Sequence, residues 1–299
     1  MQVLADVETL DHTHDDLSWL RAPWKRTWTH RIAGGRFVID VHDQPGRWMD
    51  EAELAGLQDE LDSIGQRSLD ESLSYGVFSR TRSAFRNRVI AVARDGQTGT
   101  PCGFTAMVYL PLHRVGGRTE LIIHLGLTMI ARDHRGSRLQ TPLFQRTFRS
   151  PIVNQFRMSF IVTNIAASPA GIGAVSDYFD GFPSYDGSTR SRPLHREVAQ
   201  QVLERDRHEF GCSRAAVFDP KTFVVKGSNQ VDGGGASAFI KTDPVSRYRN
   251  PDCNAFCAAT LNFERGDELF QVGRADFLRG MWKSRRTKRR VSKSGASIG

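Results

Sequence analysis

Residues 119–148 constrain the fold of this chain more than any other stretch, and their sequence is TELIIHLGLTMIARDHRGSRLQTPLFQRTF. A mostly apolar, strand-like run leads directly into a basic loop that contains Gly136, and a helix pattern follows. In this order of elements, the free N–H groups of the loop and the N-terminus of the helix point toward one place, an arrangement that binds phosphate. The stretch therefore predicts a site for an anionic ligand that carries phosphate.

The loop also resembles a known family motif. Residues 130–140, IARDHRGSRLQ, are similar to the strand and pyrophosphate-loop motif of the GNAT acyltransferase superfamily, V-x-P-x-Y-R-G-x-G-x-G/A. Ile130 stands where the family has Val, His134 stands at its aromatic position, and Arg135 and Gly136 match its Arg-Gly pair. The chain thus resembles a divergent member of this superfamily.

Three positions of the loop depart from the motif. Arg132 replaces the usual Pro, and Arg138 and Gln140 stand where the family's Q/R-x-x-G-x-G/A signature has small residues. A side chain at such a position must point away from the ligand or replace a backbone contact with its own, which Arg can do bidentately. The departures leave the acyl donor open between acetyl-CoA, a longer acyl-CoA and the phosphopantetheine of an acyl carrier protein.

The flanking sequence supports the same resemblance. Residues 88–113 hold two β-rich segments around a Gly-containing turn, which predicts a hairpin. Residues 159–166 predict a buried strand, and residues 168–182 resemble the family's N-P-A-A-x-x-x-Y-x-x-x-G-F ending with two extra residues. The resemblance covers residues 32–186 and implies an α/β fold with a mixed central sheet flanked by helices.

Hydrophobic spacing predicts further elements. Residues 36–41 predict a first strand, and residues 50–65 predict an amphipathic helix that Gly65 closes. Beyond the resemblance, the sequence predicts a helix over 193–210 and two short strands about a turn in each of 215–227 and 261–273. Residues 187–280 are therefore expected to form a C-terminal α+β extension.

The net charge is concentrated at the C-terminal end. The chain holds 41 Lys and Arg against 33 Asp and Glu, a formal net charge of +8. Seven basic residues and no acidic residue lie in residues 281–299, which leaves +1 for the rest. This tail is rich in Ser, Gly and Lys, a composition that predicts disorder. The alternative function is therefore a module that binds nucleic acid or an acidic protein through this tail. Apart from the tail, nucleic acid is not expected as a partner.

Composition excludes other classes of protein. No apolar run approaches the roughly 20 residues of a membrane-spanning helix, so no membrane partner is expected. The acidic N-terminus lacks the pattern of a secretory signal, and a cytoplasmic protein is expected. The four cysteines, Cys102, Cys212, Cys253 and Cys257, have neither a disulfide-framework spacing nor a zinc-knuckle spacing, so no metal is predicted.

The N-terminal segment, residues 1–31, holds three tryptophans in an otherwise polar sequence, Trp19, Trp24 and Trp28. Exposing several large aromatic side chains together is unfavourable. We therefore expect them to pack on the domain, with a substrate lid as the alternative.

The resemblance assigns residues to the acyl donor. In this family the strand before the loop carries a bulge that frees backbone groups for the pantetheine amides and the thioester carbonyl. That role falls here on Thr128, Met129 and Ile130. The pyrophosphate falls to the loop amides, which belong to Arg135, Gly136, Ser137, Arg138, Leu139 and Gln140.

Acyl transfer to an amine also needs groups that move protons. Side chains alternate along a strand, so Glu120, His124 and Thr128 are expected on one face beside the acceptor. His124 is the preferred proton relay because an imidazole titrates near neutral pH, and its position is similar to that of relay histidines in arylalkylamine acetyltransferases. A core histidine is the alternative. Tyr178 stands near a family tyrosine that protonates the leaving thiolate, with a packing role as its alternative.

The acceptor pocket is expected in the parts of the chain that vary within the family. The segment 69–87 carries Arg80, Arg82 and Arg86, which either grip an anionic acceptor or are solvated. The implied function is transfer of an acyl group from a CoA or acyl-carrier thioester to the amine of a small molecule or an amino acid.

Overall fold

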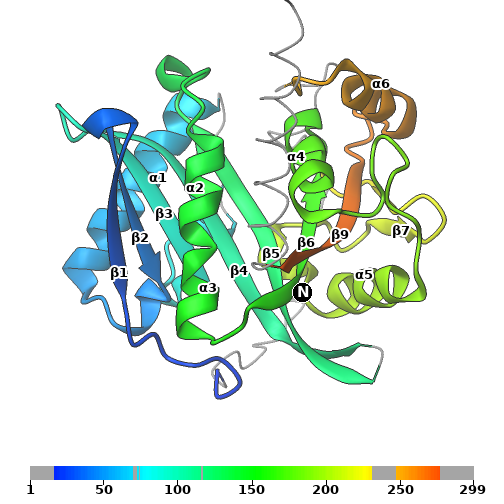
Figure 1. Ribbon diagram of the computed structural model, residues 1–299, viewed down its shortest axis with the longest axis horizontal. Coiled ribbons are helices and arrows are strands. Elements are labelled where there is room, and N and C mark those ends of the chain that lie inside the picture. The colour runs from blue at the N-terminus through cyan, green and yellow to red at the C-terminus, as the bar shows by residue number, and fades with distance from the viewer. Residues whose placement is uncertain (1–16, 70–72, 74, 116, 231–246, 277–299) are drawn as a thin grey trace, which may run out of the picture.

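Strands from both halves of the chain form one sheet. The computed structural model describes residues 17–69, 73, 75–115, 117–230 and 247–276. Within these residues the strands form a nine-stranded sheet in the order β1-β2-β3-β4-β5-β6-β9-β8-β7 (Figure 1). Their bounds are β1 (Thr27–Ile32), β2 (Phe37–Asp43), β3 (Arg88–Asp95), β4 (Pro101–Val115), β5 (Arg118–Ile130), β6 (Ser159–Ala166), β7 (Val217–Asp219), β8 (Val224–Lys226) and β9 (Glu268–Asp276). The predicted mixed α/β sheet is confirmed.

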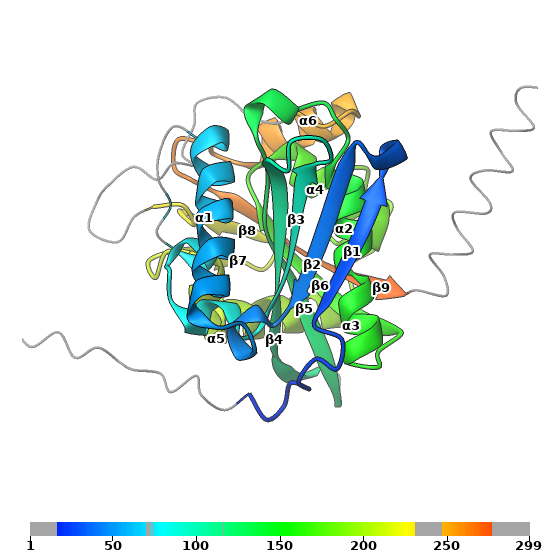
Figure 2. The ribbon, with the colours of Figure 1, turned by 90° about the vertical axis from the view of Figure 1, so that its left-hand side faces the viewer.

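Helices cover both faces of the sheet. They are α1 (Glu51–Ser68), α2 (Gln140–Thr147), α3 (Arg149–Asn154), α4 (Pro169–Phe179), α5 (Pro193–Arg205) and α6 (Pro251–Thr260). On β4, Phe104 packs in the cluster of α1 and Val108 packs in the cluster of α5, so these two helices share one face. Met107 packs on the opposite face with Leu143 of α2. Figure 2 shows α1 on one side of the sheet and α2 and α3 on the other.

The first long helix begins as predicted and ends later. Asp50 caps α1 and Glu53 reaches back to the Asp50 backbone, which completes a capping box. The helix runs past Gly65, the expected end, to Ser68. A Cβ atom on Gly65 would lie 2.9 Å from the ring of Phe78, so this glycine allows close packing and does not terminate the helix.

The hairpin of β3 and β4 and the strand β6 lie where they were predicted, but one strand was missed and one prediction of local structure is wrong. The polar edge strand β1 lacks an apolar pattern and was not predicted. The run 261–273 contributes the single strand β9, because its first part is a turn held by Asp267. The Asp267 carboxylate accepts hydrogen bonds from the backbone N–H groups of Gly227, at 3.0 Å, and Asn262, at 3.3 Å.

The predicted C-terminal extension continues the same sheet. Its described part contains α5, α6 and β7 to β9, and β9 pairs with β6 from Ser159–Asp276 to Ala166–Leu269. The tail predicted to be disordered, 281–299, lies outside the described residues. Among the residues that are described, no helix has the length and apolar character needed to cross a bilayer.

Two of the three N-terminal tryptophans pack on the domain as expected. Trp19 and Trp28 are partly buried against the core that β2 and α2 share. Trp24 is 68% exposed, although its indole N–H donates to the carbonyl of Val153 at 3.3 Å. The asparagine at the end of α3, Asn154, donates to the carbonyl of Lys25 at 2.9 Å, which ties the entering chain to this helix.

A buried carboxyl group, Asp43, lies where β2 meets α3. Ser150 donates to its Oδ2 at 2.5 Å, and Asn154 donates to the same oxygen. Its Oδ1 has no hydrogen-bond partner among the described residues. Burial outweighs these hydrogen bonds and raises the pKa of Asp43 to about 6.

Asp43 should therefore make stability depend on pH. A carboxyl with a raised pKa in the folded state stabilises the fold below its unfolded pKa, and that contribution is lost as pH rises through the folded value. Relative to Asp43→Asn, the wild-type free energy of unfolding should fall by about 2 kcal/mol between about pH 4.5 and about pH 7.5. Urea unfolding of both proteins measures this difference. A difference that stays constant, or that grows with pH, would show that Asp43 is ionised throughout.

Candidate active site

The central parallel pair of strands opens toward one edge of the sheet. β5 and β6 pair from Ile122–Ile161 to Leu125–Asn164. Beyond these residues β5 continues along β4 to Ile130, while β6 continues along β9 to Ala166. The two strands therefore separate and leave backbone groups of both unpaired where they part.

A bulge in β5 lies at the point of separation. Thr105 pairs with Thr128 but Met107 pairs with Leu125, so β5 holds one extra residue in this interval. A Cβ atom on Gly126 would lie 2.3 Å from the carbonyl oxygen of Ala106, which explains the glycine. The bulge was expected at residues 128–130 and begins earlier.

The bulge changes which side chains share a face. His124 lies opposite Val108, on the face of α1 and α5. The Thr128 hydroxyl lies 2.7 Å from that of Thr105, on the opposite face, because the extra residue reverses the alternation. The expectation that Thr128 shares a face with His124 is therefore wrong.

The loop after β5 presents free N–H groups. Gly136 has a φ of 81°, and Arg138 has a φ of 62°, the left-handed conformation that glycine adopts most readily. An ordinary side chain in this conformation costs about 1 kcal/mol, which explains why a small residue suits the position of Arg138. The backbone N–H groups of Arg138, Leu139 and Gln140 have no hydrogen-bond partner among the described residues. They point, with the N-terminus of α2, to an anion site.

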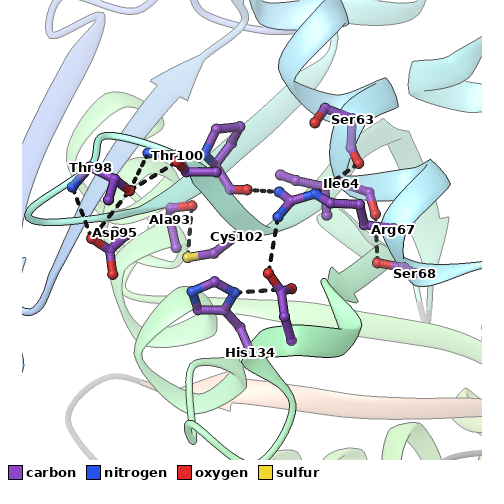
Figure 3. Close-up of polar contacts among 12 residues, drawn as sticks. Ser63, Ile64, Arg67, Ser68, Ala93, Asp95, Thr98, Thr100, Cys102 and His134 are labelled. Carbon is purple, nitrogen blue, oxygen red and sulfur yellow. Dashed lines mark hydrogen bonds and ion pairs between the residues drawn. The ribbon is translucent and has the colours of Figure 1, made fainter.

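Contacts with α1 hold the loop in place. The Arg135 guanidinium donates to the carbonyl of Ser68 at 2.9 Å, so this side chain is directed at the helix end. Arg67 donates to the carbonyl of Pro101 and pairs with Asp133 at 3.4 Å, and His134 Nδ1 lies 3.1 Å from the same carboxylate. Figure 3 shows Arg67 and His134 on either side of this contact. These contacts fix the start of the loop relative to the sheet.

One cavity of about 1000 Å³ joins the loop, the opening between the strands and the face of α5. Nearly all of the predicted site residues line it, namely His124, Thr128, Met129, Ile130, Arg135, Gly136, Ser137, Arg138, Leu139, Gln140 and Tyr178. Ser137 contributes a buried hydroxyl that has no partner among the described residues. Residues 134–176, which border the loop end, contain five arginines and no Asp or Glu, so this end favours an anion.

Glu120 is not among the residues that line the cavity. Its carboxylate lies 3.6 Å from the guanidinium of Arg274 on β9, near the start of β5. Tyr178, on α4, is 51% exposed, and its hydroxyl lies 3.4 Å from that of Thr141. The structure thus brings Tyr178 and His124 to the cavity but not Glu120.

His124 is fully buried at the cavity wall. Its Nδ1 lies 3.0 Å from the Thr163 hydroxyl, its ring stacks on Phe210 at 4.3 Å, and its Nε2 has no partner among the described residues. Burial and the nearby Arg88 guanidinium lower the pKa of His124 to about 3. The imidazole therefore stays neutral near pH 7, which contradicts the expectation that it titrates there.

Sequence reasoning missed two carboxyl groups in the same wall. Glu209, which precedes Phe210, pairs with the buried Arg88 at 2.8 Å. Glu268, the first residue of β9, accepts a hydrogen bond from Ser228 at 2.6 Å. Both line the cavity, although they come from the C-terminal extension. Each of these carboxyl groups contacts a residue that is distant in the sequence, so no local sequence pattern could have predicted its place in the cavity wall.

The arginine-rich segment contributes less than expected. Arg80 pairs with Asp59 and Asp62, and Arg82 pairs with Glu51, at 2.8 Å, on the outside of α1. Neither these arginines nor Arg86 lie among the cavity-lining residues. The same segment does supply Tyr75, Gly76 and Val77 to the cavity.

In the part of the chain that the structure describes, no group of three His, Cys, Asp or Glu residues is arranged to hold a metal ion.

A mixed sheet flanked by helices, a bulge in the strand before the loop and a glycine-containing turn from that strand into a helix are the features that the resemblance to the GNAT superfamily implies. The chain has a GNAT-like fold in a divergent form. The assignment of the fold rests on the mixed sheet, the bulge in β5 and the loop that follows it.

No protein-family model and no curated protein match the sequence. Solved structures give distant likenesses. The glucosamine N-acetyltransferase region of a fungal multi-domain β-N-acetylglucosaminidase is 18% identical, with a TM-score of 0.29, over 44% of this chain and only 14% of that protein. A GNAT family N-acetyltransferase of Escherichia coli in complex with CoA is 17% identical, with a TM-score of 0.33, over 50% of this chain and 69% of that one. A chain of the NatC complex bound to Gag peptide and CoA is 16% identical, with a TM-score of 0.31, over 47% of this chain and 80% of that one.

Proposed function

We propose that this protein is an acyltransferase that moves an acyl group from a CoA thioester to the amine of a small molecule. The observation that carries the proposal is the continuity of one cavity, which leads from the unpartnered amides of the loop through the separated strands to a buried polar wall. Such a passage suits a long donor whose phosphates and reactive end lie far apart.

The residues of the loop fit the phosphates of the donor. The free N–H groups of Arg138, Leu139 and Gln140 and the unpartnered Ser137 hydroxyl supply hydrogen-bond donors, and the exposed Arg138 side chain supplies positive charge. Backbone groups at the bulge, from Gly126 to Ile130, would take the pantetheine arm. The same features accept the phosphopantetheine of an acyl carrier protein, which remains the second donor class.

The groups beside the separated strands would support the transfer. An acyl thioester supplies an activated carbonyl carbon when it is bound. Tyr178 has an accessible hydroxyl on the cavity wall and would protonate the departing thiolate. Neutral His124, with its free Nε2, would form a hydrogen bond with the acceptor and would not carry the proton, because its pKa is too low.

Gly136→Val tests the donor site. A valine at a φ of 81° is strained and forces the loop to move, so the dissociation constant for CoA should rise by about tenfold or more, roughly 1.4 kcal/mol. Gly99→Val is a matched control, since Gly99 also has a positive φ, of 74°, with open space around it, but lies in the turn between β3 and β4. Calorimetric titration with CoA measures both. Equal affinity in the two variants would contradict the loop assignment.

A further inference from the structure

The cavity wall contains a carboxyl group, Glu268, that has no ion pair among the described residues. Glu268 begins β9, two residues before Phe270, whose ring centroid lies 6.5 Å from that of His124. Since side chains alternate, Glu268 and Phe270 share the face of β9 that looks toward His124. Among the described residues, the Ser228 hydroxyl donates to Glu268 at 2.6 Å, and no ion pair involves this carboxyl.

Two other charged groups in the cavity wall, Arg88 and Glu209, are matched to each other. Arg88, beside His124, is paired with Glu209 at 2.8 Å, and Asn87 donates to the other oxygen of Glu209 at 2.9 Å. That ion pair is neutral as a whole, so it does not compensate Glu268. The cavity is thus cationic at the loop, and its wall also holds the Glu268 carboxyl, which has no ion pair among the described residues and favours a cation beside it.

Two further polar atoms in the cavity wall have no hydrogen-bond partner within the part of the chain that the structure describes. His124 Nε2 is buried and unpaired among the described residues. Asn229 lies near the Glu268 carboxyl, but its Nδ2 forms no hydrogen bond of good geometry within them. Buried polar groups in proteins nearly always have partners, so unpaired groups in a cavity wall point to a ligand that supplies them. Tyr75, Phe210 and Phe263 add apolar surface beside these atoms.

We propose that Glu268 binds the ammonium group of the acceptor and takes its proton, and that the acceptor is a small primary amine without a carboxylate beside its nitrogen. The inference rests on the proposed acyltransferase function and narrows its acceptor. A neutral oxygen of the acceptor would meet the amide of Asn229, and a carboxylate there would be repelled by Glu268.

The environment of Glu268 suits a base better than that of His124. Burial raises the pKa of Glu268, although the hydrogen bond from Ser228 opposes the rise. A base is most effective when its pKa lies near the working pH, whereas the pKa of His124, about 3, is far below it.

The proton transfers balance as follows. The ammonium gives one proton to the Glu268 carboxylate, and the free amine nitrogen bonds to the thioester carbonyl carbon. The carbon–sulfur bond then breaks, and the nitrogen loses its second proton to the leaving sulfur through the Tyr178 hydroxyl. The products are an amide and a thiol, and protonated Glu268 returns its proton to water.

The test compares Glu268→Gln with Glu264→Gln, an exposed carboxylate outside the cavity on the turn before β9. Acetyl-CoA is supplied with amines in matched pairs, glycinamide with glycine and phenethylamine with phenylalanine. Wild type should acetylate the member of each pair without a carboxylate. Glu268→Gln should lower kcat/KM by about 100-fold with an unchanged dissociation constant for CoA, and Glu264→Gln should change neither. Glu268→Asp, which keeps the charge on a shorter side chain, should retain part of the activity.

Each contrary outcome is distinct. Normal turnover by Glu268→Gln, a preference for glycine and phenylalanine, or CoA binding without acetylation of any of the amines would overturn the acceptor assignment and leave the donor site intact. A wild-type protein that does not bind CoA would instead overturn the proposed function itself.

Discussion

Gly126→Ala is expected to lower the free energy of unfolding by about 3 kcal/mol, at the upper end for overpacking. The added Cβ would lie 2.3 Å from the carbonyl oxygen of Ala106, and this oxygen belongs to backbone that cannot turn aside as a side chain can. β4 or β5 must shift, and the bulge must change. Because the bulge lies where β5 and β6 separate, affinity for CoA should fall as well, by at least tenfold.

Gly56→Ala is the control for this substitution. Gly56 lies within α1 with nothing within 4 Å of its Cβ position, so alanine should stabilise the protein by about 1 kcal/mol. Urea unfolding and calorimetric titration with CoA measure both variants. A Gly126→Ala protein with wild-type stability and wild-type affinity for CoA would contradict this prediction, because it would show that β5 can accommodate a side chain at the bulge.

Arg88→Met should lower the free energy of unfolding by about 3–5 kcal/mol, at least as much as Gly126→Ala, because it leaves the carboxylate of Glu209 without its cation at a nearly buried site. The Arg88 side chain is 4% exposed and that of Glu209 is 13% exposed, so little water replaces the lost partner. The same change should raise the pKa of His124, since the Arg88 charge helps to lower it.

Arg88→Met combined with Glu209→Gln separates the ion pair from packing. Removing both charges should recover at least half of the stability lost in the single variant, because no buried charge then remains unpaired. Chemical denaturation gives the double-mutant cycle, and histidine NMR titration follows His124. Strictly additive losses would mean that Arg88 acts through its packing alone.

The elements that the sequence predicted well are those with a local hydrophobic signal. The apolar runs gave β3, β4, β5 and β6, and the spacing of Leu54, Leu57 and Leu61 gave α1. The polar edge strand β1 and the turn before β9 carry no such signal, since backbone pairing and the carboxylate of Asp267 organise them.

In the candidate site, too, the features with a local signal could be predicted from the sequence and the others could not. The Gly136 loop could be predicted because strand, loop and helix follow one another, and each is set by its own residues. The side of the sheet on which Thr128 lies could not be predicted, because one extra residue in β5 turns every later side chain of the strand to the opposite face. The low pKa of His124 could not be predicted either, because it arises from burial under Phe210 and from the charge of Arg88.

By itself, therefore, the sequence determined a mixed α/β sheet and a glycine-containing loop that leads from a central strand into a helix. Only the tertiary structure decided which ionisable groups line the cavity. The pairing of β9 with β6 places Glu268 on the same face as His124, and the turn after α5 carries Glu209 to Arg88. Contacts between residues so distant in the chain depend on strand order and packing, which no local pattern encodes.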